Sequence, residues 1–183
     1  MISDAPFALR LDASDFELFD VPARFAQDRA TLDARWRGLM AGVHPDRFAA
    51  GSPAEQCAAM QWAIRFNQAY ERLKQPLARA SYLCELNGQR VDAETNTAMP
   101  PSFLVRMMDW REALDRARGA VAVQALADEA EACRRDLLAE VAGLIDDAGD
   151  WAAAAARVRA LMFVARFAQE VERRAETFDG LDG

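Results

Sequence analysis

The sequence is short of two basic side chains. Lys74 is its only lysine, against 21 arginines, and His44 is its only histidine. A lone histidine cannot supply the paired Glu-x-x-His motifs on which helical metal enzymes rely. The formal net charge of -7 argues against a general nucleic-acid-binding protein, because phosphate neutralisation needs a surplus of clustered cations. We therefore expect no metal, no cofactor and no nucleic-acid partner.

Cysteine is also scarce. Cys57, Cys84 and Cys133 lie far apart and form no Cys-x-x-Cys pair, so the sequence suggests neither a structural zinc site nor a disulfide framework. We expect all three to be reduced side chains of a hydrophobic core.

Long apolar runs are missing as well. No stretch is apolar over the length that a bilayer crossing needs. The first residues, Met-Ile-Ser-Asp-Ala-Pro, lack the basic and then apolar order of a signal peptide. These absences predict a cytoplasmic protein with no membrane partner. With 52% hydrophobic side chains in 183 residues, the chain can nevertheless bury a core, as one domain or two small ones.

The hydrophobic periodicity is helical almost throughout and predicts an all-α protein. One long helix begins near Asp28 and ends before Pro45, because the residue before a proline is pushed out of the helical region. Another begins after Ser52, which is followed by a proline and, three positions on, by a glutamate. Their stripes predict an antiparallel hairpin and consist of Leu32, Trp36, Leu39 and Val43, and of Ala59, Ala63, Phe66, Tyr70 and Leu73.

Short helices flank this hairpin. A leading helix should close the open side of the hairpin with Phe16, Leu18 and Phe19. Residues 76–86 form a connecting helix, and the polar, proline-punctuated stretch after it marks a linker.

A second domain lies beyond the linker. We expect three antiparallel helices there, over about 102–118, 121–146 and 151–177, with Asp150 capping the last, and such helices make a small bundle. The predicted organisation is an N-terminal domain with its connecting helix over 14–87, a linker over 88–101 and a C-terminal domain over 102–178.

The tripeptide His44-Pro45-Asp46 lies between the two matched stripes, at the tip of the predicted hairpin. Pro45 fixes the turn and removes an amide donor, which leaves Asp46 held outward as an acceptor that a partner arginine can grip in a bidentate pair. Two other interpretations stay open. The tripeptide could simply end a helix, with Asp46 capping the next segment of the chain, or His44 could be a general base oriented by Asp46, although no nucleophile stands beside it in sequence.

The tripeptide, its two helices and the run 66–73 (FNQAYERL) resemble a J domain. The continuation 75–83 (QPLARASYL) is similar to the segment that joins the J domain to the C-terminal bundle in the HscB family. The resemblance extends from residue 15 to about residue 178. It implies an N-terminal J domain, a C-terminal three-helix domain and a co-chaperone of iron-sulfur cluster assembly that is not itself an enzyme.

The resemblance also implies one partner for the tripeptide. It would engage a DnaK/HscA-like chaperone and promote hydrolysis of the ATP that this chaperone holds. The residues assigned to that contact are His44, Pro45, Asp46, Arg35, Arg37 and Arg47. J domains usually carry a basic run just before the tripeptide, but residues 39–43 read Leu-Met-Ala-Gly-Val. Long-range attraction to the partner should therefore be weak and sensitive to salt.

The helix after Pro101 is apolar on two faces. We assign one stripe to the bundle core: Phe103, Met107, Trp110 and Leu114. A three-helix bundle buries only one face of each helix, so the other is either a docking patch or further core. Phe163 points away from the likely core face of the last helix, as a flank residue or as an interface anchor.

The resemblance implies that this second face receives the iron-sulfur scaffold protein IscU. The matching positions are Leu104, Val105, Met108, Asp109, Glu112 and Phe163. One turn beyond Glu112 the family has a further acid, where this sequence has Arg116.

Three functions therefore compete. The first is a co-chaperone that delivers the IscU-type scaffold to its chaperone, and the second is a J-domain protein with a different or broader range of clients. The third, a helical enzyme, lacks the inward-facing ligands that it needs. A second copy of the same chain, in a homo-oligomer, is a further partner that the sequence allows.

Overall fold

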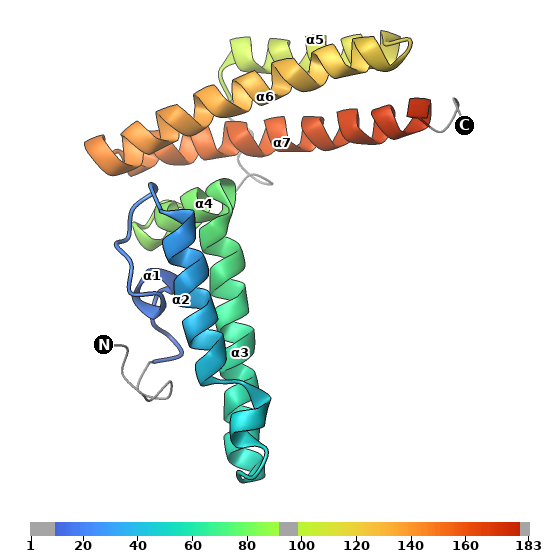
Figure 1. Ribbon diagram of the computed structural model, residues 1–183. Helices are drawn as coiled ribbons and strands as arrows, with labels where there is room; N and C mark the ends of the chain where they lie inside the picture. The colour runs from blue at the N-terminus through green and yellow to red at the C-terminus, as the bar shows by residue number, and fades with distance from the viewer. Residues whose placement is uncertain (1–9, 92–98, 180–183) are drawn as a thin grey trace. The chain divides into compact units, whose positions relative to one another are not determined.

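All secondary structure in the described part of the chain is helical. The computed structural model describes residues 10–91 and 99–179, and its ribbon is drawn in Figure 1. Nine helical segments and no strand occur in these ranges, which confirms the predicted all-α class. None of the described helices combines the length and the apolar character that a membrane crossing needs.

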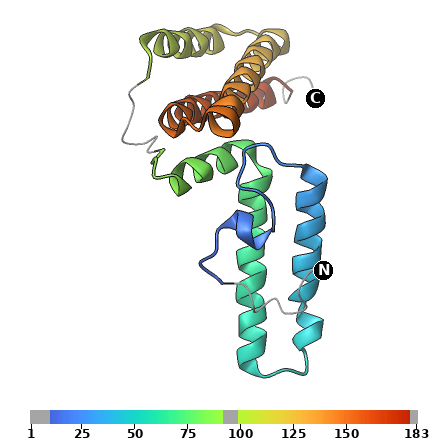
Figure 2. The same cartoon turned by 90° about the vertical axis from the view of Figure 1, so that its left-hand side faces the viewer.

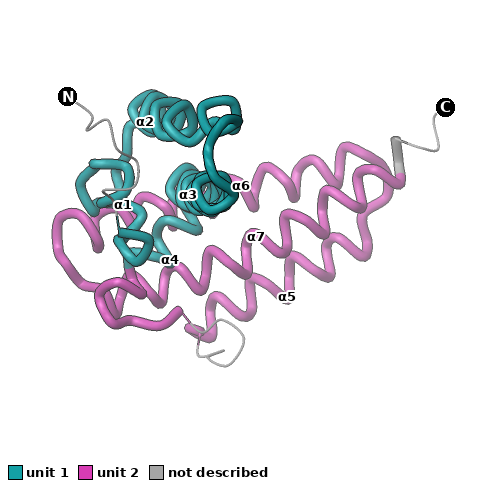
Figure 3. Tube along the Cα trace, turned by 90° about the horizontal axis from the view of Figure 1, so that it is seen from below, with its two compact units in different colours: residues 1–83 teal, residues 84–183 magenta. Residues whose placement is uncertain are grey.

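The chain divides into two compact units, residues 1–83 and 84–183, which Figure 3 draws in different colours. The predicted domain limits, 14–87 and 102–178, stay a prediction. Residues 92–98, in the middle of the expected linker, lie outside the described part of the chain.

A helical hairpin dominates the first unit. Helix α2 (Arg29–Gly42) and helix α3 (Pro53–Lys74) run side by side and antiparallel in both Figure 1 and Figure 2. The Asp28 carboxylate caps α2 by accepting the Thr31 amide at 2.8 Å. Ser52 and Glu55 form a capping box at the start of α3, each accepting the other's backbone amide. These caps satisfy amides that a helix start leaves without partners, and both agree with the sequence.

Two shorter helices complete this part of the chain. Helix α1 (Asp15–Leu18) is capped by Ser14, and helix α4 (Pro76–Leu86) begins at a proline, as predicted. Phe16, Leu18 and Phe19 are buried, so the leading helix closes the hairpin as expected. Phe66 and Leu73 of α3 are fully buried as well.

The buried stripe of α3 differs in part from the predicted one. Trp62 and Ala69 are buried, whereas Ala63 and Tyr70 are only half-buried. Tyr70 stacks on Trp36 at a ring distance of 5.0 Å and donates its hydroxyl to Asp33 at 2.7 Å. An aromatic side chain with a polar end is favoured at such a rim, where the ring is covered and the hydroxyl reaches a polar partner.

A buried ion pair ties α1 to α3. The Asp15 side chain is fully buried, with one oxygen 2.7 Å from Arg65 and the other 3.0 Å from Arg72. Its backbone amide donates to the Tyr82 hydroxyl at 3.0 Å. Asp15 thus connects the leading helix, α3 and α4.

Replacing Asp15 with alanine should destabilise the hairpin. Arg65 and Arg72 would then face each other without a carboxylate between them. We expect a loss of about 3 kcal/mol in the free energy of unfolding, the low end for a broken buried pair, because both arginines can turn toward water. Urea unfolding followed by circular dichroism measures it. The exposed Asp12→Ala is the control and should leave the transition unchanged, and an unchanged transition for Asp15→Ala would refute the assigned role.

Three helices build the second unit. They are α5 (Pro101–Arg116), α6 (Ala120–Ala142) and α7 (Trp151–Asp179). The middle helix, expected over about 121–146, is α-helical to Ala142 and continues as a π-helical segment, η3, over Gly143–Ala148. Gly149 then adopts φ +63, which favours glycine. Asp150 caps α7 as predicted, accepting the Ala153 amide at 3.0 Å.

Small side chains let α6 and α7 pack closely. Ala154 and Ala155, from the alanine run at the start of α7, are buried, and so is Ala130 further back along α6. Larger apolar side chains fill the remaining core along both helices: Val123, Leu137, Val141, Val158, Leu161, Val164 and Phe167.

The cysteines depart from expectation at one position. Cys84 and Cys133 are buried and Cys57 is exposed, and all three are free thiols. The prediction of three core cysteines is therefore wrong for Cys57, which lies on the solvent side of α3. Burial raises the pKa of the Cys84 thiol to about 11, so this thiol stays protonated and unreactive at neutral pH.

Candidate functional site

The His-Pro-Asp tripeptide lies at the tip of the hairpin, where the sequence places it. Helix α2 ends at Gly42, the next residue, Val43, is buried, and Pro45–Phe48 form a single 3-10 turn, η2, before α3. Figure 2 shows this turn at the end of the hairpin, away from α1. The tripeptide therefore lies on the surface, at the tip formed by two helices.

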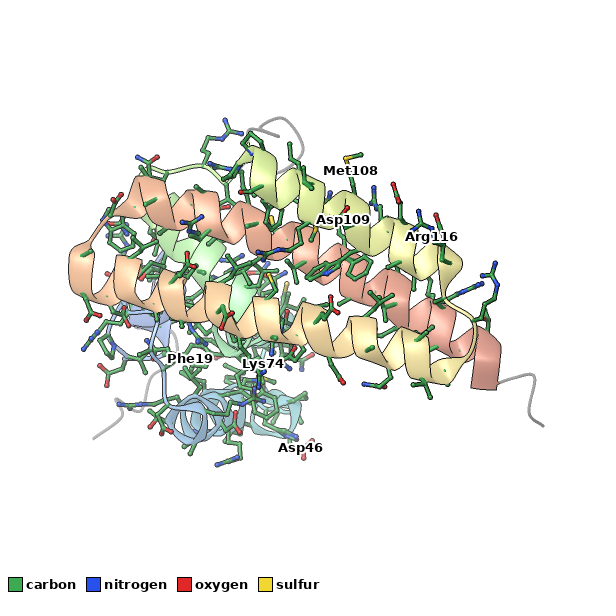
Figure 4. The ribbon with its side chains drawn as sticks, turned by 90° about the horizontal axis from the view of Figure 1, so that it is seen from above. Phe19, Asp46, Lys74, Met108, Asp109 and Arg116 are labelled. Atoms are coloured by element: carbon green, nitrogen blue, oxygen red, sulfur yellow. The ribbon has the colours of Figure 1, made fainter. Side chains whose placement is uncertain are left out.

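The Asp46 side chain is 91% exposed, and Figure 4 shows it at the outer edge of the hairpin. Its backbone amide donates to Nδ1 of His44 at 3.3 Å. The same ring nitrogen lies 3.5 Å from the Asp46 carboxylate. The exposed carboxylate oxygens can accept hydrogen bonds from another molecule.

The three arginines assigned to the chaperone contact differ in their surroundings. Arg37 and Arg47 are exposed on α2 and η2. Arg35 donates to the Asp20 carboxylate at 2.8 Å and so joins α2 to the segment that precedes it. The structure gives Arg35 a structural contact, and its role toward a partner stays a prediction.

The second predicted surface lies on α5. Leu104, Val105 and Met108 are 41%, 55% and 62% exposed. Figure 4 shows Met108 pointing away from the bundle, with Asp109 beside it on the same helix. Three neighbouring apolar side chains left in solvent form an unusual surface for a helix whose other face is packed. We call Leu104, Val105 and Met108 the α5 patch.

Phe163 lies beside this helix but is half-buried. Its ring meets that of Phe103 edge to face at 6.3 Å, and the Arg166 guanidinium lies 5.9 Å from its centre. Phe163 therefore belongs to the seam between α5 and α7, where it supports the helix as well as any partner.

The two acids predicted for this surface are exposed, but they differ in charge balance. The Glu112 carboxylate lies 2.7 Å from the Arg116 guanidinium one turn further along α5. No hydrogen bond or ion pair to the Asp109 carboxylate occurs among the described residues.

Comparison with known proteins decides the family. A sequence model described as the HSCB C-terminal oligomerisation domain matches residues 99–172, which include α5, α6 and most of α7. The co-chaperone protein HscB homolog of Bordetella petrii is 50% identical over 157 residues, covering 85% of this chain and 92% of that protein. The chain belongs to the HscB co-chaperone family.

Solved HscB structures share the fold. Chaperone HscB from Vibrio cholerae has a TM-score of 0.78 at 35% identity, and the match covers 90% of this chain and 99% of that one. Human co-chaperone protein HscB has a TM-score of 0.86 at 24% identity, over 91% and 84% of the two chains. The Bordetella petrii and human relatives are named as co-chaperones.

One residue that supports the hairpin tip was missed in the sequence. The Gln56 side-chain amide donates to the carbonyl oxygens of Phe48 and Gly51, both at 3.2 Å. It thereby links the first turn of α3 to the chain that leaves η2. The signal was available, since a glutamine in the first turn of a helix can reach back to the residues before it.

The anchor of α5 was missed in part. Trp110 is buried, in agreement with its assignment to the core, but its partners were not foreseen. Its ring stacks on Phe167 of α7 at 5.0 Å, and its indole N–H donates to Glu129 of α6 at 3.0 Å. One side chain thus connects α5, which carries the α5 patch, to both other helices, and no local sequence pattern reveals such a pairing.

Proposed function

We propose that this chain stimulates ATP hydrolysis by a DnaK/HscA-like chaperone and delivers an IscU-type iron-sulfur scaffold to it. The observation that carries the proposal is the Asp46 carboxylate, which is almost fully exposed at the tip of a supported hairpin. Membership of the HscB family supports the co-chaperone role.

The tip is suited to act on another molecule. Pro45 fixes the backbone, His44 holds the Asp46 amide, and Gln56 ties the turn to α3. A carboxylate carried on a fixed backbone loses less freedom when a partner guanidinium binds it in a bidentate pair. In this proposal the tip only binds, and the bond that breaks is in the ATP held by the partner.

The α5 patch is suited to hold a folded client. Its three apolar side chains would leave water on binding, and apolar burial contributes about 25 cal/mol per Å². Trp110 keeps the helix that carries them in one position. A rigid surface favours a partner of fixed shape, whereas a flexible one suits many unfolded clients.

Single-turnover ATP hydrolysis tests the proposal against the broader-client alternative. The chaperone is measured alone, with this chain, with the scaffold, and with both. We expect the rate with both to exceed the sum of the separate stimulations, because the chain brings its client to the ATPase. Replacing the scaffold with an unfolded polypeptide should abolish that excess. An equal excess with the unfolded polypeptide would favour a general co-chaperone.

A further inference from the structure

An ion pair extends the α5 patch toward the C-terminal end of the helix. Met108, Glu112 and Arg116 are spaced four residues apart, so they lie along one face of α5. The Glu112 and Arg116 side chains are 59% and 77% exposed, and their charged groups are 2.7 Å apart. Figure 4 shows Arg116 at the end of α5, on the helix that carries Met108.

The pair adds little to the stability of the helix. An exposed pair at this spacing contributes only about 0.3–0.5 kcal/mol, and an arginine in the last turn adds a small interaction with the helix dipole. Its larger effect is on the charge that the surface shows to a partner. The two charges balance each other, but the guanidinium, with five N–H donors, keeps some of them for a second acceptor.

The charges around the pair are mixed. Asp109 and Asp115 are exposed acids on the same helix. Arg111 is 3.4 Å from Glu170 of α7, so its charge is partly balanced. Arg106 donates to the Cys133 sulfur at 3.6 Å. Arg116 is the exposed cation at the C-terminal end of the face that carries Met108, at a position separate from Asp109.

We infer that Arg116 is a specificity-determining residue for the client, selecting a scaffold that places an acidic side chain against the last turn of α5. Charges at the rim of an interface choose partners chiefly by penalising like charges. A client with a basic side chain at that position would meet Arg116 and not Glu112. The inference rests on the proposed function, since it assumes that the scaffold binds the α5 patch.

Scaffold binding to charge variants, measured by titration calorimetry with the purified IscU-type protein, tests this inference. Arg116→Glu should weaken binding about tenfold, because it turns an attraction into a repulsion. Arg116→Ala should weaken it about threefold, as expected for loss of one exposed pair. Glu112→Gln should weaken it least or strengthen it, because it releases the guanidinium for the client. The difference between Arg116→Glu and the native chain should shrink as salt is raised.

Two further variants separate the possible failures. Arg135→Glu, on the exposed side of α6, changes the net charge by the same amount and should leave binding unchanged.

If Met108→Ala weakens binding but Arg116→Glu does not, the inference about Arg116 is wrong and the proposed function stands. If neither variant affects binding, the scaffold does not use the α5 patch and both are wrong. Glu112→Gln weakening binding as much as Arg116→Glu would also overturn the inference, since Glu112 would then be the client's contact.

Discussion

The variant Asp46→Asn should lose nearly all stimulation of the partner ATPase while folding normally. The substitution keeps the size of the side chain and removes its charge, so a partner arginine loses its bidentate acceptor. Truncating one side of such a charged contact costs about 2–5 kcal/mol, enough to reduce complex formation by more than an order of magnitude. Single-turnover hydrolysis by the chaperone, at equal concentrations of native and variant chain, measures the loss.

The exposed position of Asp46 makes this a clean test. With 91% of its side chain in solvent, the substitution should not change thermal unfolding or scaffold binding. Asp136→Asn, the same change at an exposed carboxylate on α6, is the matched control and should stimulate as the native chain does. Full stimulation by Asp46→Asn would show that the tip carboxylate is not the trigger.

The variant Met108→Ala should weaken scaffold binding about tenfold, because a large apolar side chain that is buried on binding contributes more than about 1 kcal/mol. Met108 is the most exposed residue of the α5 patch, so its truncation leaves no cavity in the bundle. Basal stimulation through the tip should stay at the native level. Fluorescence anisotropy with labelled scaffold gives the affinity, and the ATPase rate without scaffold gives the basal value.

Val121→Ala provides the matched control for the α5 patch. Val121 is 87% exposed on α6, so its truncation removes exposed apolar surface from another helix. It should leave scaffold binding unchanged. Equal losses for Val121→Ala and Met108→Ala would mean that binding depends on general stickiness rather than on a defined surface.

Phe163→Ala is a less direct probe of the same surface. Phe163 contacts Phe103 in the seam between α5 and α7, so its removal affects both packing and any client contact. The sequence allowed Phe163 to be either a flank residue of the core or an interface anchor, and its half-buried position is compatible with both roles. If the single variants Phe163→Ala and Met108→Ala both unfold, these residues belong to the core and not to a client surface.

Much of the fold could be predicted because local signals agree with it. Ser52 with Glu55, Asp28 and Asp150 each announce a helix start that the structure contains. The two stripes of the hairpin predict its pairing, and the tripeptide between them marks the tip. Caps, prolines and apolar periodicity act within a few residues, so sequence alone carries them.

Contacts between distant side chains could not be predicted in the same way. The sequence favours Arg35 as a surface cation for a partner, yet it is tied to Asp20, and nothing local distinguishes the two cases. The stacking of Trp110 on Phe167 depends on how α5 lies on α7. The pair of Glu112 and Arg116 could have been predicted, since a spacing of four residues permits it. Its position beside the α5 patch matters only because Met108 is exposed.

The central claim is that one chain joins a trigger at its tip to a client on its α5 patch, and a competition experiment tests it most directly. Excess Asp46→Asn chain is added to the native chain, the scaffold and the chaperone, and ATP hydrolysis is measured over time. We predict that the rate falls to the level without scaffold, because the variant holds the client and cannot trigger hydrolysis, while the double variant Asp46→Asn with Met108→Ala does not inhibit. An undiminished rate with Asp46→Asn, or equal inhibition by the double variant, would contradict the account.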